Sequence, residues 1–467
     1  MIDVAVIGAG LGGLAAAVHC ARAGLRVEVF ERSSVPGGFA RTWTRGPYTF
    51  EGSLHALDAV GPGEPNRRVL DDLGIGDALD LVEPAEVRVE QWRDGRRFRV
   101  PRGREALLTL MADAFGDDVS ALLDRAAEAH RASFAALLEG APGAREFAEL
   151  TARSGDALLR DHGLTADGRA LLGGIASWQG ARLASINALN LLLLIHGYHV
   201  LGGRVPRGGS RALVDALTAQ LTAHGGVLHL DRPVTGVSLD RRRCTGLTAG
   251  EDVTARHVVS AIAPPVLVEE LLPATARPPM DLDQRALSRS LLRLTAGLTV
   301  DPALPYELAL RGTRDGFEGL SVTARHVVDP DAAPAGHGIV SVSTPWDRGD
   351  VIRPARKEAI ADRLWDVVES ATGVGLRAHA EHVALAHPGT FARYGGVPGG
   401  SVFGYPPVIG QAGRGALTAE TRVPHLWLAG GWVFPGPGQT AALISGRLAA
   451  HRILQACGHP GGVREQG

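Results

Sequence analysis

The residues with the clearest chemical meaning are three glycines near the start of the chain, Gly8, Gly10 and Gly13. They follow residues 3–7, an apolar run rich in β-branched side chains that predicts a buried parallel strand. Gly8 would make a turn, Gly10 would let a pyrophosphate approach the backbone, and Gly13 would let a helix pack on the strand. A helix starting at Leu11 would direct free N–H groups and the positive end of its dipole at the phosphates. This spacing predicts a dinucleotide site.

The next predicted strand, residues 26–30, ends at an acidic residue, Glu31. A carboxylate there can accept hydrogen bonds from ribose hydroxyls, and its charge would repel a 2′-phosphate. The predicted ligand is therefore FAD or NAD, not NADP. The following segment adds further candidates for cofactor binding. Glycines allow close approach of the backbone to a flat or phosphorylated group, and arginine pairs with phosphate. These candidates are Arg32, Gly37, Gly38 and Arg41.

Composition excludes several other classes of protein. A net charge of −2 and a pI near 6.8 over 467 residues give no reason to expect nucleic acid as a partner. Three well-separated cysteines fit no metal spacing, so no metal is predicted, and they indicate a reducing compartment. The chain starts at the first predicted strand, which predicts no signal peptide. The longest apolar run, residues 186–195, is too short to span a bilayer. Its residues 189–195 predict a core helix, with a lipid-facing patch as the alternative. We expect a cytoplasmic protein, with contact to a membrane surface left open.

Two segments close to the first motif carry a resemblance to a known family. Residues 36–42 read Pro-Gly-Gly-x-x-Arg-Thr, and residues 50–53 form a Phe-acid turn with a glycine. Together with the glycine loop and Glu31, they resemble the FAD fold of the amine oxidase superfamily. Within it, the chain is most similar to the branch of bacterial phytoene desaturases, carotene isomerases and retinol saturases. The Gly-x-x-His stretch ending at His55 is similar to the Gly-x-His stretch of retinol saturases.

A second motif lies in the middle of the chain, where a glycine-rich turn at 202–210 precedes a predicted helix over 211–223 and strands over 227–230 and 256–261. In the family that it resembles, the position of Val234 contacts adenine through its backbone. The segments on either side are predicted to bind substrate. Their candidates for the pocket are Trp178, His199, Arg393 and Tyr394.

A third motif, residues 426–442, predicts a strand, a glycine–proline turn and a helix that starts at Thr440. In the family this block covers the flavin, and a helix N-terminus stabilises the negative charge of reduced flavin. The resemblance assigns cofactor contacts to Gly430, Gly431, Gln439 and Thr440, and Trp432 is a candidate wall of the substrate pocket. Many relatives have an acidic residue where Gly431 stands. The phytoene desaturases lack it too, which weakens the amine oxidase interpretation more than the carotenoid one.

The predicted fold is α/β, with a discontinuous Rossmann-like FAD-binding domain and an inserted α+β substrate-binding domain. The predicted boundaries are 1–85, 203–268 and 415–467 for the FAD-binding domain, and 86–202 and 269–414 for the substrate-binding domain. No Ser-His-Asp order, zinc spacing or phosphate-binding lysine loop is visible, so the flavin must carry the chemistry. No flavin-attachment motif is visible either, which predicts non-covalent FAD.

The resemblance implies an FAD-dependent enzyme that moves hydride between flavin and a C–C bond of a lipophilic polyene, isoprenoid or other natural-product intermediate. Desaturation, saturation and isomerisation all stay open. His55 is the titratable group expected beside the flavin, in a catalytic or flavin-tuning role, and a purely structural role as a hydrogen-bond partner of the backbone stays open. Two alternatives remain: an amine oxidase acting at a C–N bond, and a flavin- or lipid-binding protein without turnover.

Overall fold

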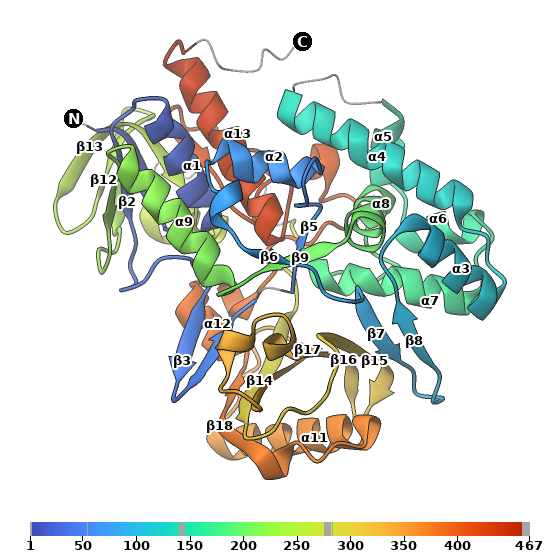
Figure 1. The fold of residues 1–467 in the computed structure, drawn as a ribbon. Coiled ribbons are helices and arrows are strands. Elements are labelled where there is room, and N and C mark those ends of the chain that lie inside the picture. The colour runs from blue at the N-terminus through green and yellow to red at the C-terminus, as the bar shows by residue number, and fades with distance from the viewer. Residues whose placement is uncertain (1, 54, 140–144, 275–281, 283, 460–467) are drawn as a thin grey trace.

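The computed structural model describes residues 2–53, 55–139, 145–274, 282 and 284–459. Two seven-stranded sheets organise the chain and lie in different parts of the molecule (Figure 1). A two-stranded sheet, β3 (Thr42–Arg45) with β4 (Tyr48–Glu51), and a three-stranded sheet, β5 (Leu57–Asp58), β9 (Gly203–Pro206) and β6 (Leu81–Val82), complete the strand pairing described.

The first sheet gathers strands from three distant parts of the sequence. Its order is β10-β2-β1-β13-β12-β11, with β19 also paired to β13. The strands are β1 (Ile2–Ile7), β2 (Val27–Phe30), β10 (Val227–His229), β11 (Gly236–Asp240), β12 (Arg243–Thr248), β13 (Asp252–Ser260) and β19 (Leu426–Leu428). Because β1 runs parallel to β2, β13 lies parallel to β1 and β19 lies parallel to β13, their carboxyl ends meet at one edge. The first glycine loop, Glu31 and the Gly430 turn all leave from that edge.

Helices α1 (Leu11–Arg22), α9 (Ser210–Ala223) and α13 (Gln439–Ala456) lie together beside this sheet (Figure 1). Their apolar side chains share one core with β1 and β2. Helix α1 reaches that core through small residues, since Ala15, Ala16 and Ala17 are fully buried. Small side chains let helix axes approach closely, which explains why an alanine-rich helix sits at the centre of this region.

The second sheet has the order β18-β14-β17-β16-β15-β7-β8 and is antiparallel except where β15 runs parallel to β7. Its strands are β7 (Arg88–Gln91), β8 (Arg97–Val100), β14 (Ser290–Leu298), β15 (Glu307–Arg314), β16 (Phe317–Thr323), β17 (Gly338–Trp346) and β18 (Ala380–Ala386). Helix α11 (Pro354–Thr372) covers one face (Figure 1) and buries Leu364, Trp365 and Val368 against it. Helix α12 (Pro388–Gly395) follows β18.

A group of helices forms a third core beside the two sheets (Figure 1). Its members are α3 (Arg104–Phe115), α4 (Ser120–Glu139), α5 (Arg145–Thr151), α6 (Gly155–Asp161), α7 (Ala166–Gly173), α8 (Ala188–Leu194), the 3-10 helix η2 (Gly174–Gln179) and the π-helix η3 (Ile195–Leu201). The apolar run predicted as a core helix is α8, where Leu191, Leu192 and Leu194 are buried. Within the part of the chain that the structure describes, no helix is both long enough and apolar enough to cross a membrane.

The predicted fold class is confirmed, because a parallel sheet of the Rossmann type is joined to a second, mixed sheet with its own helices. Residues 2–30, 227–260 and 426–428 supply the first sheet, and residues 88–100 and 290–386 supply the second. The domain boundaries given above stay a prediction. The parallel pairing of β7 with β15, more than two hundred residues apart, was not expected from the sequence.

Candidate functional site

Two glycines of the first loop, Gly12 and Gly13, are required by the protein's own packing. A Cβ atom added to Gly13 would lie 2.2 Å from the carbonyl oxygen of Gly8, and one added to Gly12 would lie 2.5 Å from the backbone of Gly430. Gly446 on α13 is equally close to α1, with 2.3 Å from its added Cβ to the carbonyl oxygen of Gly12. The loop, the Gly430 turn and the two helices therefore meet backbone to backbone.

Gly10 differs from its neighbours, because a Cβ atom added there meets no protein atom within 4 Å. Its φ of −71° is also acceptable for any L-residue. Neither strain nor internal packing therefore explains a glycine at this position. The backbone of Gly37 lies beside the loop and donates a hydrogen bond to Ala9 at 2.8 Å. Open space beside a helix N-terminus, walled by a second glycine segment, fits a pyrophosphate.

Glu31 is held beside this space. Its Oε2 accepts a hydrogen bond from the backbone N–H of Ala9 at 2.8 Å, and its Oε1 accepts one from Ser33 at 2.9 Å. The residue is buried, with 8% of its surface exposed. Each carboxylate oxygen has two lone pairs, so each can still accept a bond from a ribose hydroxyl. The position fits the predicted role, and the hydrogen bonds show that Glu31 also fixes the loop.

The segment that contains Val234 lies next to Glu31. The backbone N–H of Glu31 donates to His229, and the backbone N–H of Arg232 donates to the carbonyl of Glu31 at 2.8 Å. Val234 itself is partly buried against the core on the β11 and β12 side of the first sheet. This neighbourhood agrees with the expected place of an adenine contact.

The next candidates form a group near the segment that follows Glu31. They are Arg32, Arg41, Arg393 and Tyr394. The guanidinium of Arg32 donates to the backbone carbonyls of Arg393 and Tyr394, at 3.2 Å each. Arg393 and Tyr394 are exposed at the end of α12, where the Arg393 guanidinium lies over the Tyr394 ring. Arg41 donates to the carbonyl of Val35 at 3.5 Å. The structure thus places Arg393 and Tyr394 on the surface beside Arg32 and gives them no shared contact with His55.

The start of α13 is tied to the same region by side chains. Gln439 donates to the hydroxyls of Ser53 at 3.2 Å and Ser210 at 3.0 Å, and its own Oε1 is buried without a partner among the described residues. Thr440 donates to Asp58 at 3.1 Å. Burial raises the pKa of Asp58. An unsatisfied amide oxygen and a helix N-terminus facing this region fit a polar ring edge such as that of flavin.

Glu51, at the end of β4, connects these pieces. Its carboxylate accepts bonds from Ser53 N–H at 3.0 Å, from Ser210 N–H at 2.9 Å and from the Ser210 hydroxyl at 2.8 Å. The guanidinium of Arg325 also donates to it at 3.3 Å. Glu51 and Arg325 are both buried. The carboxylate therefore fixes the turn that leads to His55 against the N-terminus of α9.

His55 faces the second sheet. Its Nδ1 lies 3.2 Å from Oε2 of Glu307 on β15, and its ring stacks on Trp178 with centroids 5.1 Å apart. The Tyr306 hydroxyl donates to the backbone carbonyl of His55. Glu307 also accepts bonds from the hydroxyls of Ser321 and Thr323, the latter at 2.9 Å. Burial alone would raise the pKa of Glu307, but the charge of His55 and these hydrogen bonds lower it overall.

Aromatic side chains extend from this pair. Tyr198 on η3 meets the Trp178 ring edge to face at 4.9 Å and donates to the carbonyl of Ala56. A small hollow of about 20 Å³ is lined by Trp178, Tyr198 and Tyr306, among others. Trp432 lies on the turn before α13, and its ring packs on the ring of Tyr405 with centroids 5.1 Å apart. These rings suit contact with a flat, apolar molecule.

His199 takes a different position from the one expected. It is fully buried, and its Nε2 lies 2.7 Å from the guanidinium of Arg88, which also pairs with Glu90 at 2.7 Å. Burial and the charge of Arg88 lower the pKa of His199. The structure therefore places His199 in a buried polar network of the core, not on the wall of an open pocket.

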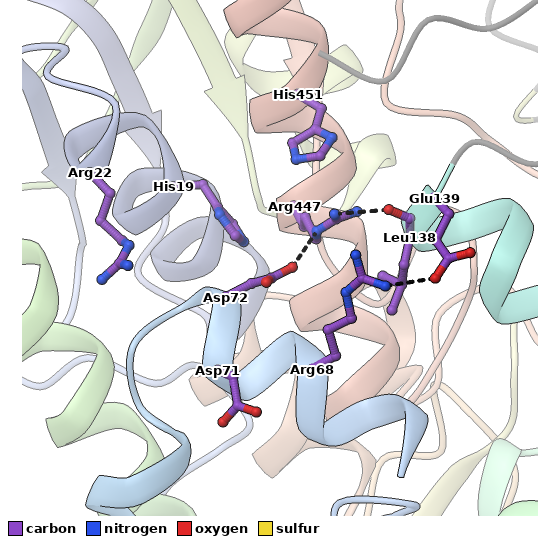
Figure 2. Close-up of a pocket in the computed structure, with 9 residues that line it drawn as sticks. All are labelled: His19, Arg22, Arg68, Asp71, Asp72, Leu138, Glu139, Arg447 and His451. Atoms are coloured by element: carbon purple, nitrogen blue, oxygen red, sulfur yellow. Dashed lines mark hydrogen bonds and ion pairs between the residues drawn. The ribbon is translucent and has the colours of Figure 1, made fainter. Parts of the chain in front are cut away.

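A cavity of about 680 Å³ lies at a different place, between α1, α2 (Pro65–Asp72), the end of α4 and α13 (Figure 2). Figure 2 shows Arg447 bonded to Asp72 and to the carbonyl of Leu138, and Arg68 paired with Glu139. Arginine bonded to the last carbonyls of a helix satisfies its orphan acceptors. We interpret this cavity as a junction that fastens α4 to α13 and α2, since Arg447 bonds to Asp72 and to the end of α4, and Arg68 pairs with Glu139.

Two features of the site escaped the sequence. Glu307 lies 252 residues from its partner His55, and no motif marks either Glu307 or the hydroxyls that support it. The Phe-acid turn pointed to Glu51, but nothing indicated its bonds to Ser210. Among the described residues no group of three His, Cys, Asp or Glu side chains could hold a metal ion.

These observations define a class of protein. The model of the flavin containing amine oxidoreductase family matches residues 11–454, so the chain belongs to that family. It is an FAD-dependent oxidoreductase, and the predicted cofactor is confirmed.

Among characterised proteins, the chain is similar to three whose names specify a reaction. It is 29% identical to hydroxyneurosporene desaturase of Cereibacter sphaeroides, over 97% of each chain. It is 27% identical to all-trans-zeta-carotene desaturase of Myxococcus xanthus, over 97% of this chain and 94% of that one. It is 26% identical to human all-trans-retinol 13,14-reductase, over 59% of this chain and 50% of that one. The suspected branch of the superfamily is therefore confirmed.

Solved structures share the fold at low identity. An oxidoreductase from Methanosarcina mazei matches with a TM-score of 0.68 and 16% identity, over 96% of this chain and 99% of that one. Putrescine oxidase bound to putrescine matches with a TM-score of 0.66 and 17% identity, over 98% and 99%. At such identities the likeness extends to the fold alone.

Proposed function

We propose that this enzyme moves hydride between its flavin and a C–C bond of a lipophilic polyene, isoprenoid or related natural-product intermediate. The observation that carries the proposal is the similarity over nearly the whole chain to two desaturases of carotenoids. Similarity to a retinol reductase and to a prolycopene isomerase keeps saturation and isomerisation within the same proposal.

Each part of the site has a role in this proposal. Gly10, Glu31 and Gly37 would hold the dinucleotide, and the start of α13 would lie against the flavin. When bound, FAD supplies the redox chemistry by accepting or donating a hydride. The chain's own residues then orient the substrate and exclude water. Trp178 and Tyr198 present apolar rings to a flat substrate, and His55 is the group that can exchange a proton.

An amine oxidase is the second candidate, because putrescine oxidase and cyclohexylamine oxidase share the fold. Their identities of 17% and 18% do not extend to the reaction. A primary amine would also have to enter as a cation or lose its proton, and the described part of the site around His55 offers Glu307 as an anion already paired with histidine. A binding protein without turnover is the third candidate.

Anaerobic addition of substrate separates the three candidates. A carotenoid or retinoid should bleach the flavin of the holoenzyme if it is a desaturase, or reoxidise the chemically reduced flavin if it is a saturase. Bleaching by a primary amine but not by a polyene would favour the amine oxidase. No flavin response to either class, and no isomerised polyene among the products, would favour a binding protein. A comparison of metabolites between a deletion strain and its parent would then name the substrate.

A further inference from the structure

The pairing of His55 with Glu307 determines where the histidine carries its proton. An ionised carboxylate has no hydrogen to donate, so the proton of the 3.2 Å contact must belong to Nδ1 of His55. Glu307 has 1% of its side-chain surface exposed and accepts two further hydroxyl bonds, from Ser321 and Thr323. These donors stabilise the charged form of a buried carboxylate.

The other ring nitrogen of His55 has no such partner. Among the described residues, Nε2 makes no hydrogen bond, and the side chain keeps 24% of its surface exposed. The stacked Trp178 ring and the bond from Tyr306 to the His55 carbonyl hold the ring in one orientation. With Nδ1 bonded to Glu307, a neutral His55 presents a lone pair at Nε2, and a charged His55 presents a proton there.

We propose that Glu307 is a positioning residue that keeps the His55 proton on Nδ1 and so reserves Nε2 for proton exchange during the reaction. The use of Nε2 in proton exchange rests on the proposed function. The position of the proton on Nδ1 follows from the contact with Glu307 and does not depend on that function. Because His55 follows β4 and Glu307 lies on β15 of the second sheet, the two parts of the chain must be in place together before His55 is set.

Other charged groups surround the pair of His55 and Glu307. Arg293 on β14 and Arg88 on β7 are buried cations whose charges interact with Glu307. Arg293 also donates to the backbone carbonyl of Glu51 at 3.1 Å. Tyr306, next to Glu307, has a pKa raised by burial and stays neutral. None of these groups offers a hydrogen bond to the His55 ring among the contacts described, so the direct partner is Glu307.

The test is imidazole ¹⁵N NMR of the holoenzyme labelled at histidine, with the His55 signals assigned by their loss in His55→Gln. The expected spectrum of the neutral ring shows the proton on Nδ1. In Glu307→Gln the Nε2–H tautomer should gain population, because a neutral amide oxygen accepts a hydrogen bond from Nδ1–H more weakly than a carboxylate does. Asp301→Asn is the matched control, since it changes a carboxylate 3.2 Å from His326 and should leave the His55 signals unchanged.

The proposal would be overturned if the neutral ring of wild-type His55 carries its proton on Nε2. It would also be overturned if the ¹⁵N signals of His55 are the same in Glu307→Gln as in wild type. The wild-type tautomer decides the question without any variant. Flavin reduction by a polyene should slow about 10-fold or more in Glu307→Gln, with a shifted pH profile. If polyenes neither reduce the oxidised wild-type flavin, nor reoxidise the reduced flavin, nor are isomerised, the proposed function is refuted and the NMR result still stands.

Discussion

The nucleotide loop and the His55 site are built in opposite ways. Around Gly8 to Gly13 the contacts are backbone against backbone, and the added Cβ atoms at Gly12 and Gly13 have no room. Around His55 the contacts are made by side chains from two distant segments. Trp178 lies on η2, and Tyr306 and Glu307 stand together at the start of β15. The first region depends on the absence of side chains, and the second depends on their chemistry.

This difference explains what each region can contribute. A backbone cradle can hold a phosphate in any member of a family, because N–H groups and helix dipoles do not depend on side-chain identity. A site assembled from side chains can be changed by single substitutions without loss of the fold, and so can set the reaction. Four substitutions would break or sharpen the comparison.

The largest effect is expected from Gly13→Val. Its Cβ would lie 2.2 Å from the Gly8 carbonyl oxygen and 2.9 Å from the side chain of Ala261, and the backbone of the loop cannot move away cheaply. We expect a loss of stability above about 3 kcal/mol and little soluble protein. Soluble yield and the denaturation midpoint measure it. A variant as stable as wild type would show that the close packing described here is wrong.

Gly10→Val should leave the fold intact and abolish FAD binding. The added side chain enters the open space beside the loop, where a pyrophosphate would lie, and the φ of −71° tolerates it. We expect FAD affinity to fall more than about 100-fold, with an unchanged denaturation midpoint for the apoprotein. Flavin released by denaturing the purified variant is the measurement. Normal FAD content would contradict the assignment of this space.

Glu51→Gln should weaken the connection between the two regions. It removes the charge that accepts bonds from Ser210 and Arg325, and leaves the Arg325 cation buried with less compensation. A loss of about 3 kcal/mol is expected, measured by chemical denaturation. Glu28→Gln is the control, because Glu28 pairs with His229 at a half-exposed position and should cost less than about 1 kcal/mol. Equal losses in the two variants would refute the role given to Glu51.

The smallest effect concerns His130, a buried histidine on α4 that contacts His196 on η3. Burial lowers the pKa of His130 to about 3, and its Nδ1 lies 3.0 Å from Nδ1 of His196. His130 stays neutral in the folded protein, whereas the unfolded chain binds a proton below pH 6.5, so this group's stabilisation is present above pH 6.5 and lost as the pH falls toward 3. In His130→Gln, proton uptake on unfolding at pH 5 should fall by about one. Unchanged uptake would count against a neutral His130.

The same contrast separates what the sequence could predict from what it could not. The strand, glycine loop and helix around Gly10 were predictable because their signals are local and repeat a known spacing. The core helix at 188–194 followed from its apolar run. Glu307 was not predictable, because a lone glutamate in a strand has no local signature and its meaning comes from a partner 252 residues away. The contact of His199 with Arg88 was not predictable either, because the two residues are 111 positions apart in the chain and no local pattern connects them.

The central claim is that His55 serves the reaction while the glycine loop holds the cofactor. Anaerobic flavin reduction in wild type and His55→Ala, with FAD content measured on the same samples, tests it most directly. We predict equal FAD content and a reduction rate about 10²- to 10⁴-fold lower in His55→Ala. A loss of less than about tenfold would assign His55 to packing or hydrogen bonding, and loss of FAD itself would make it part of the cofactor site; either result would contradict the account.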